Sequence, residues 1–154
     1  LAKYSPGFQE AAEILFAPSH AEQLIYSGIF APLLEEVIFR GGIFRLLRTK
    51  LSFLWGAMIS SILFGLYHGN LVQFIYAALL GMLLAYVYET YGSFKAPIVA
   101  HVAANVVVCM LTWVDGFTWM FASPIYAILI TVGCMAVVWL GVGKIYITKP
   151  LQKC

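Results

Sequence analysis

Long apolar runs separated by short polar turns dominate this sequence and constrain its fold more than any other feature. Lys, Arg, Asp and Glu together make up only 10% of the 154 residues, whereas 62% are hydrophobic. A soluble domain has about 25% charged residues, because its surface must stay hydrated. The sequence therefore excludes a soluble enzyme, a disordered chain and a nucleic-acid-binding module, and it indicates a protein whose solvent is lipid.

Five runs have the apolar character of membrane helices, which need about 20 residues to cross a bilayer. They cover residues 21–47, 52–67, 72–88, 95–113 and 120–147, with turn-forming residues between them. A shorter amphipathic stretch over residues 5–17 predicts a helix that lies in the membrane interface. We therefore predict an all-α fold: a polytopic transmembrane bundle of five helices preceded by an interfacial helix.

We interpret the chain as a single integral-membrane domain over residues 1–154. The interfacial helix takes residues 1–18, a core takes residues 19–113, and the final membrane helix takes residues 119–147. Because the first residue is Leu1, we expect a fragment that lacks earlier membrane helices. Basic residues gather at alternate connections: Arg45, Arg48, Lys50, Lys95, Lys144, Lys149 and Lys153. This asymmetry predicts that these connections are cytoplasmic, and the compact bundle suits a bacterial plasma membrane.

Three charged residues interrupt the first long apolar run: Glu35, Glu36 and Arg40. Each charge at a helix centre costs about 2.5–3.5 kcal/mol of insertion free energy, so three cost roughly 7–10 kcal/mol. The large apolar residues of the same helix return only roughly 4–8 kcal/mol on that scale. The net free energy of inserting this helix is therefore close to zero, which indicates that the charges serve a function.

The spacing of these charged residues predicts a different role for each of them. Glu36 and Arg40 are four residues apart, so they share a helix face and can form an ion pair. Glu35 points about 100° away and has no partner in its own helix, which suits it to general acid or base catalysis. Pro32 predicts a bend one turn earlier. A structural ion pair with a passenger glutamate is the alternative interpretation.

Later apolar runs carry further polar side chains. His68 ends the second run, and His101 and Asn105 share a helix face in the fourth run because they are four residues apart. Taken alone, His68 is typical of an interfacial residue, and the pair on the fourth run is typical of hydrogen bonding between membrane helices. Each feature by itself is weak evidence for a site.

Together the polar residues form three ordered motifs on successive helices: EExxxR from Glu35 to Arg40, FxxxH from Phe64 to His68, and HxxxN from His101 to Asn105. The set resembles the CPBP family of intramembrane proteases, which contains CAAX proteases and bacteriocin-processing enzymes and is also called the Abi family. The resemblance covers roughly residues 21–113, with no departure at any motif residue. It implies an intramembrane endopeptidase that acts on a peptide or protein substrate in the bilayer, lipidated in some relatives.

The resemblance also implies roles for individual residues. Glu35 is expected to act as the general base that activates water, together with His68. His101 and Asn105 are expected to stabilise the oxyanion that forms when water attacks the peptide carbonyl. Three further residues are expected to hold these catalytic side chains in place without contacting the reacting atoms: Glu36, Arg40 and Phe64. Neither a covalent nucleophile nor a cofactor is needed for this chemistry.

Other mechanisms and functions stay open at this stage. A zinc-dependent protease would use Glu35, His68 and His101 as ligands; we favour the metal-free mechanism, because Asn105 is a poor zinc ligand and a good oxyanion donor. A non-catalytic scaffold or bacteriocin-immunity protein is a second alternative, against which the intact motif set argues. A proton-coupled carrier is a third, and the lack of an internal repeat argues against it.

In straight parallel helices the candidate residues would lie at different distances from the basic connections. Measured from the basic connections at 1.5 Å per residue, Glu35 lies about 18 Å along its helix, His68 about 25 Å and His101 about 10 Å. Tilted or bent helices are needed to bring them together. We predict that Glu35, His68, His101 and Asn105 nevertheless converge on one water-accessible cavity.

Overall fold

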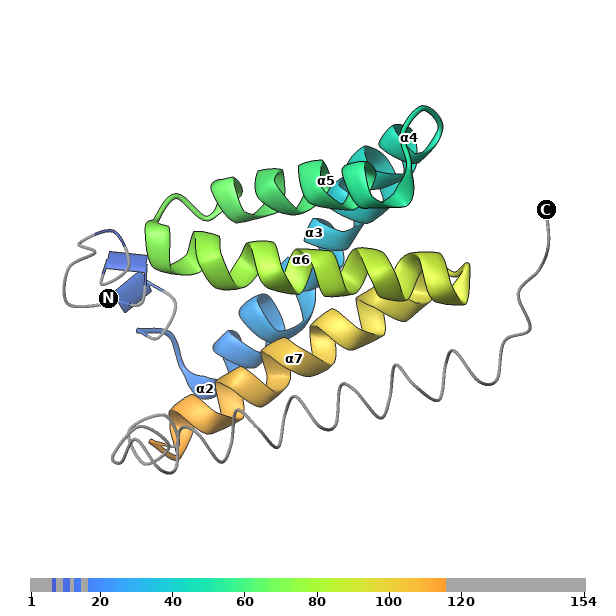
Figure 1. Cartoon of the computed structure of the whole chain (residues 1–154). Coiled ribbons are helices and arrows are strands. Elements are labelled where there is room, and N and C mark those ends of the chain that lie inside the picture. The colour runs from blue at the N-terminus through green and yellow to red at the C-terminus, as the bar shows by residue number, and fades with distance from the viewer. Residues whose placement is uncertain (1–6, 8–9, 12, 15–16, 116–154) are drawn as a thin grey trace, which may run out of the picture. The chain divides into compact units, whose positions relative to one another are not determined.

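The computed structural model describes residues 7, 10, 11, 13, 14 and 17–115 (Figure 1). All regular secondary structure in this part of the chain is helical, which confirms the all-α prediction for it. The predicted final membrane helix over residues 119–147 lies outside the described residues. The chain divides into two compact units, Leu1–Met110 and Leu111–Cys154. Every candidate site residue belongs to the first unit.

The first long helix runs from residue 20 to residue 48, close to the predicted 21–47. It consists of five consecutive segments: α2 (His20–Gln23), η2 (Leu24–Phe30), α3 (Ala31–Glu36), η3 (Val37–Phe44) and α4 (Arg45–Arg48). A capping box starts it: the Ser19 hydroxyl accepts from the Glu22 backbone N–H, and the Glu22 carboxylate accepts from the Ser19 N–H. Polar capping thus sets where this helix begins.

Segments η2 and η3 are π-helical, so their backbone hydrogen bonds reach back five residues. The Ala31 N–H bonds to the Tyr26 carbonyl, and the Arg45 N–H bonds to the Arg40 carbonyl. Pro32, where the sequence predicts a bend, is the second residue of α3 and lies two residues after the end of η2. Its ring removes one N–H from the helical ladder. π-helical segments are rare and often occur at functional sites, and here they flank the segment that carries both glutamates.

Three regular helices follow: α5 (Phe53–Tyr67), α6 (Leu71–Tyr91) and α7 (Lys95–Trp113). The predicted ranges 52–67, 72–88 and 95–113 match them to within three residues. Helices α6 and α7 are long and apolar enough to cross a membrane, whereas α5 is apolar but has 15 residues. Two helices of the described part are therefore long and apolar enough to span a membrane; the prediction of five spans is not tested as a whole, because the fifth lies outside the described residues.

Helices α5 and α6 lie side by side (Figure 1), and small residues allow their backbones to approach closely. A Cβ atom on Gly65 would lie 2.8 Å from the Phe74 carbonyl oxygen, and one on Gly81 would lie 3.0 Å from Ser61 Oγ. Ala77, one turn before Gly81, is 1% exposed. Close packing of this kind holds membrane helices together where no hydrophobic effect acts between them. The small residues at four-residue spacing on α6 therefore mark a packing face.

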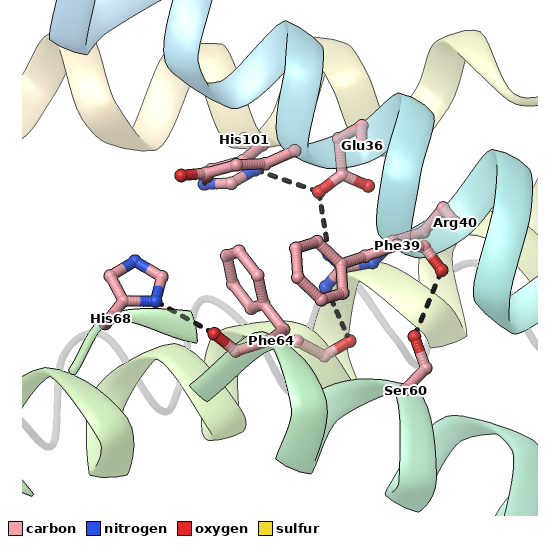
Figure 2. Close-up of polar contacts among 9 residues, drawn as sticks. Glu36, Phe39, Arg40, Ser60, Phe64, His68 and His101 are labelled. Carbon is pink, nitrogen blue, oxygen red and sulfur yellow. Dashed lines mark hydrogen bonds and ion pairs between the residues drawn. The ribbon is translucent and has the colours of Figure 1, made fainter. Parts of the chain in front are cut away.

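Segment η3 packs the first long helix against α5 and α6. The Phe39 ring contacts the Phe64 ring edge-on, with 5.0 Å between centroids, and Ser60 Oγ donates to the Phe39 carbonyl at 3.1 Å (Figure 2). Farther along, Arg48 forms an exposed ion pair with Glu89, whose hydrogen bond raises the pKa of the guanidinium. These contacts fix the helix that carries Glu35 and Glu36 against the α5–α6 pair.

Candidate active site

Glu35 and Glu36 are neighbours at the end of α3 but lie in different environments. The Glu36 side chain is 0% exposed, whereas the Glu35 side chain keeps 14% of its surface exposed. A carboxylate must reach solvent or substrate to take a proton from water. Of the two carboxylates, Glu35 is therefore the one placed to act on a water molecule.

Glu36 forms a buried ion pair with Arg40, as predicted from their spacing. Arg40 Nη1 lies 3.0 Å from Glu36 Oε1. Two partners that the sequence could not reveal also hold the guanidinium: Nη2 donates to the Gly81 carbonyl at 3.0 Å, and the group lies over the Phe64 ring at 4.7 Å. Such contacts offset the cost of burying a charge. Arg40 thereby links the first long helix to both α5 and α6.

His101 brings α7 into contact with both glutamates. Its Nδ1 atom lies 2.9 Å from Glu36 Oε1, and its Nε2 atom lies 3.6 Å from Glu35 Oε2. Figure 2 shows the ring facing the Glu36 carboxylate, which also contacts Arg40. The predicted partners Glu35 and His101 thus meet although their heights along straight helices differ.

His68 lies directly after the last residue of α5. Its Nδ1 atom is 2.9 Å from the Phe64 carbonyl oxygen (Figure 2). A carbonyl oxygen only accepts hydrogen bonds, so Nδ1 carries a proton, and in the neutral ring Nε2 is then the nitrogen with the lone pair. The Phe64 ring contacts His68 edge-on at 5.0 Å and His101 at 5.7 Å between centroids. Phe64 therefore packs against both imidazoles, and Glu35 interacts electrostatically with both of them.

Asn105 lies one turn after His101 on α7. Its Nδ2 atom donates to the Ser27 carbonyl in η2 at 2.9 Å, a contact that the sequence did not predict. One N–H of the amide holds the side chain, and the amide has a second N–H to offer to another acceptor. Ser27 thus positions Asn105 through its backbone carbonyl. Because any residue has such a carbonyl, the serine at position 27 could not predict the contact.

Asn70 lies in the turn between the second and third apolar runs, and the sequence alone predicts no role for it in the site. Its Oδ1 atom accepts from the Gln73 backbone N–H at 2.9 Å, which caps α6. Its Nδ2 atom donates to the His68 carbonyl at 3.2 Å and also bonds to the Gln73 side chain. An asparagine directly before an apolar run is a recognisable N-cap signal. Asn70 therefore fixes the short connection that carries His68.

The proposed zinc ligands can be tested against this arrangement. Catalytic zinc needs three protein ligands. Among the described residues, no three His, Cys, Asp or Glu side chains are grouped to hold a metal ion. Glu35 Oε2 and His101 Nε2 approach each other, but His68 is not grouped with them closely enough to complete a set of three ligands. As placed, the residues do not fit a zinc site, and we derive no catalytic step through one.

Comparison with known proteins places these residues within a recognised sequence pattern. Residues 17–107 match a family described as type II CAAX prenyl endopeptidase Rce1-like. Over 88 residues the chain is 35% identical to a Bacillus subtilis protein named "Putative membrane peptidase YdiL". The alignment covers 57% of this chain and 36% of that protein, so the match spans about a third of the relative. No solved structure gives a significant match. All three motifs lie inside the matched residues.

Proposed function

Because the chain belongs to the Rce1-like family of type II CAAX prenyl endopeptidases, we propose that it is an intramembrane endopeptidase whose water nucleophile is activated by Glu35. One observation carries the proposal. A partly exposed carboxylate lies beside a fully buried one, and the Nε2 atom of His101 is 3.6 Å from the exposed one. An acid–base pair of this kind is what hydrolysis by an activated water molecule requires.

In this mechanism Glu35 takes a proton from water as the water oxygen attacks the peptide carbonyl. His68 supports the same step, because its Nδ1 proton is held by the Phe64 carbonyl and its Nε2 lone pair can accept a hydrogen bond. General base catalysis of this kind contributes about 10²–10⁴-fold in rate. No covalent intermediate is required.

His101 and Asn105 are the proposed donors to the oxyanion that forms on the carbonyl oxygen. Asn105 is held by Ser27 through one N–H and offers the other. Donors in a water-poor site stabilise developing charge strongly, and the loss of one donor costs about 10²–10³-fold in kcat. Three residues support the site through the contacts described above: Glu36, Arg40 and Phe64.

We propose that no metal ion takes part. The reason lies in the donor set: an amide such as Asn105 is a poor zinc ligand, and a carboxylate with two imidazoles can activate water without zinc. A zinc-dependent hydrolase remains the competing mechanism. It predicts that a chelator abolishes cleavage, whereas the metal-free mechanism predicts no loss.

The proposed setting is a five-helix bundle in a bacterial plasma membrane, with the basic connections in the cytoplasm. Helices α6 and α7 have the length to span the bilayer, and the similar Bacillus subtilis protein is named a membrane peptidase. The proposed substrate is a peptide or protein at the membrane. A prenylated CAAX peptide is the first one to test, because the family is named for that activity.

The test uses the full chain reconstituted in liposomes and incubated with prenylated and unmodified CAAX peptides. Wild type is expected to cleave, Glu35→Gln to lose cleavage, and Glu89→Gln, which alters an exposed ion pair away from the site, to retain it. A proton-flux assay on the same vesicles tests for a carrier. Cleavage that survives in Glu35→Gln refutes the assigned base. Peptide binding without cleavage by wild type supports a scaffold instead.

A further inference from the structure

The two imidazoles of the site have different acceptors at Nδ1. The Nδ1 atom of His68 faces the neutral Phe64 carbonyl, whereas that of His101 faces the Glu36 carboxylate, both at 2.9 Å. Contact with an acceptor oxygen at this distance requires an N–H on the ring nitrogen. The contacts therefore assign a proton to Nδ1 of both rings, but only His101 has a negatively charged partner.

Glu36 is the counter-charge of the buried Arg40 guanidinium. Its Oε1 atom is 3.0 Å from Arg40 Nη1, and each of the two side chains has at most 1% of its surface exposed. The guanidinium stays charged in proteins, and a buried cation requires a counter-charge. Glu36 Oε2 has no hydrogen-bond partner within the described residues. The contacts of Glu36 with Arg40 and with His101 therefore converge on the same atom, Oε1.

We propose that Glu36 is a positioning residue that fixes His101 with its proton on Nδ1 and so presents Nε2 to Glu35 as a proton acceptor. The proton on Nδ1 follows from the contacts; the neutral ring, which keeps a lone pair on Nε2, and its catalytic consequence rest on the proposed function. A carboxylate behind an imidazole sets the tautomer, orients the ring and stabilises the imidazolium when it forms. Arg40 acts on His101 only indirectly, because it holds Glu36 in place as its charged partner.

The tautomer has a direct consequence for the oxyanion donor. A neutral ring with its proton on Nδ1 has only a lone pair at Nε2 and cannot donate from that atom. His101 must therefore gain a second proton at Nε2 before it can stabilise the oxyanion. Glu35 Oε2, at 3.6 Å, is the acid that faces this nitrogen.

The proton transfers then balance as follows. The water oxygen bonds to the carbonyl carbon, the carbonyl π electrons move to its oxygen, and one water proton passes to Glu35 and on to His101 Nε2. The imidazolium donates to the oxyanion. When the C–N bond breaks, this proton returns through Glu35 to the departing amine nitrogen, and both side chains regain their starting protonation. His68 is less suited to hold the proton, because its Nδ1 partner is an uncharged carbonyl.

The tautomer can be read directly by nitrogen NMR of the full chain in detergent micelles, with ¹⁵N-labelled histidine. The chain has three histidines, so His20→Gln and His68→Gln assign the signals of His101. We expect a proton on Nδ1 of His101 in wild type, a mixture of both tautomers in Glu36→Gln, and recovery of the Nδ1 proton in Glu36→Asp. A wild-type His101 ring with its only proton on Nε2 overturns the proposal, as does a Glu36→Gln spectrum identical to wild type.

Peptide cleavage separates this proposal from the proposed function. Glu36→Gln is expected to lose about 10–100-fold in kcat with little change in KM, the range known for carboxylates that hold metal-ligating imidazoles, and Glu36→Asp is expected to recover part of it. An Nδ1 proton in a wild-type protein that cleaves no peptide refutes the endopeptidase and leaves the role of Glu36 in place. An active wild-type enzyme with the Nε2–H tautomer refutes the role of Glu36 alone.

Discussion

Arg40 Nη2 donates to the carbonyl oxygen of Gly81 at 3.0 Å, which joins η3 to α6 across 41 positions of sequence. The same guanidinium is fully buried, pairs with Glu36 and lies over the Phe64 ring. Arg48 joins the first long helix to the end of α6 through Glu89, but that pair is about a third exposed. The two arginines form similar contacts in different dielectric surroundings, and this difference decides how much each contributes to stability.

Replacing Arg40 by Leu is expected to cost about 3–5 kcal/mol of stability, because it leaves the Glu36 charge buried without a partner. Glu89→Gln is the matched control, since it disrupts an exposed pair worth about 0–1 kcal/mol. Thermal unfolding in detergent measures both. The double variant Glu36→Leu/Arg40→Leu should be more stable than Arg40→Leu alone, because no charge is left unpaired. Equal losses in Arg40→Leu and Glu89→Gln would contradict this account.

Gly65→Ala is expected to force α5 away from α6. The added Cβ would lie 2.8 Å from the Phe74 carbonyl oxygen, closer than two such atoms can approach. Overpacking of this kind costs about 1–3 kcal/mol, and the shift should also displace His68, three residues later, and lower peptide cleavage. Unfolding and cleavage measurements on one preparation test both effects.

Gly42→Ala provides the matched control for the same substitution. There the added Cβ meets only the Val37 carbonyl, at an ordinary 3.7 Å, on an exposed position of the first long helix. Replacing a helical glycine without a clash stabilises by about 0.4–1 kcal/mol. If Gly65→Ala is tolerated as well as Gly42→Ala, the close approach of α5 and α6 is wrong.

The helix boundaries were largely predictable because turn residues mark them. Asn70 caps α6, and Gly92, with φ of 59°, ends it in the left-handed conformation. The predicted apolar run ends at residue 88, just before the charged Glu89, whereas in the structure Glu89 pairs with Arg48 and α6 continues to Tyr91. The π-helical segments were not predictable, since apolar spacing does not encode hydrogen bonds that reach back five residues.

The candidate site was predictable only in its local parts. Four-residue spacing predicts the Glu36–Arg40 pair, because both residues share one helix face. The contact between His101 and Glu36 depends on how α7 packs against α3 and leaves no trace in either motif. Glu35 and His101 do lie close together, at 3.6 Å, whereas one water-accessible cavity shared by Glu35, His68, His101 and Asn105 stays a prediction.

Asn70 offers a way to separate the capping of α6 from the positioning of His68. Asn70→Ala removes the cap and is expected to cost about 1 kcal/mol of stability. Asn70→Asp keeps an oxygen for the Gln73 N–H but loses the N–H that reaches the His68 carbonyl. We therefore expect Asn70→Asp to keep the cap, to lose some stability because its second carboxylate oxygen faces the His68 carbonyl, and to cleave about tenfold more slowly, equivalent to about 1.4 kcal/mol in the activation barrier. Full activity in a stable Asn70→Asp protein would show that the contact does not position His68.

Asn105 provides the last test, because its two proposed tasks use different N–H groups of one amide. Asn105→Ala removes the proposed oxyanion donor and is expected to lower kcat by about 10²–10³-fold, with KM within about twofold. Asn105→Asp keeps the shape but places an acceptor against the Ser27 carbonyl, so it should lose at least as much activity and also some stability. Ser27→Ala is the control, since the backbone carbonyl that holds Asn105 survives the change, and it should cleave like wild type. A loss in Asn105→Ala that appears only in KM would mean that the amide binds substrate in its ground state and does not stabilise the transition state.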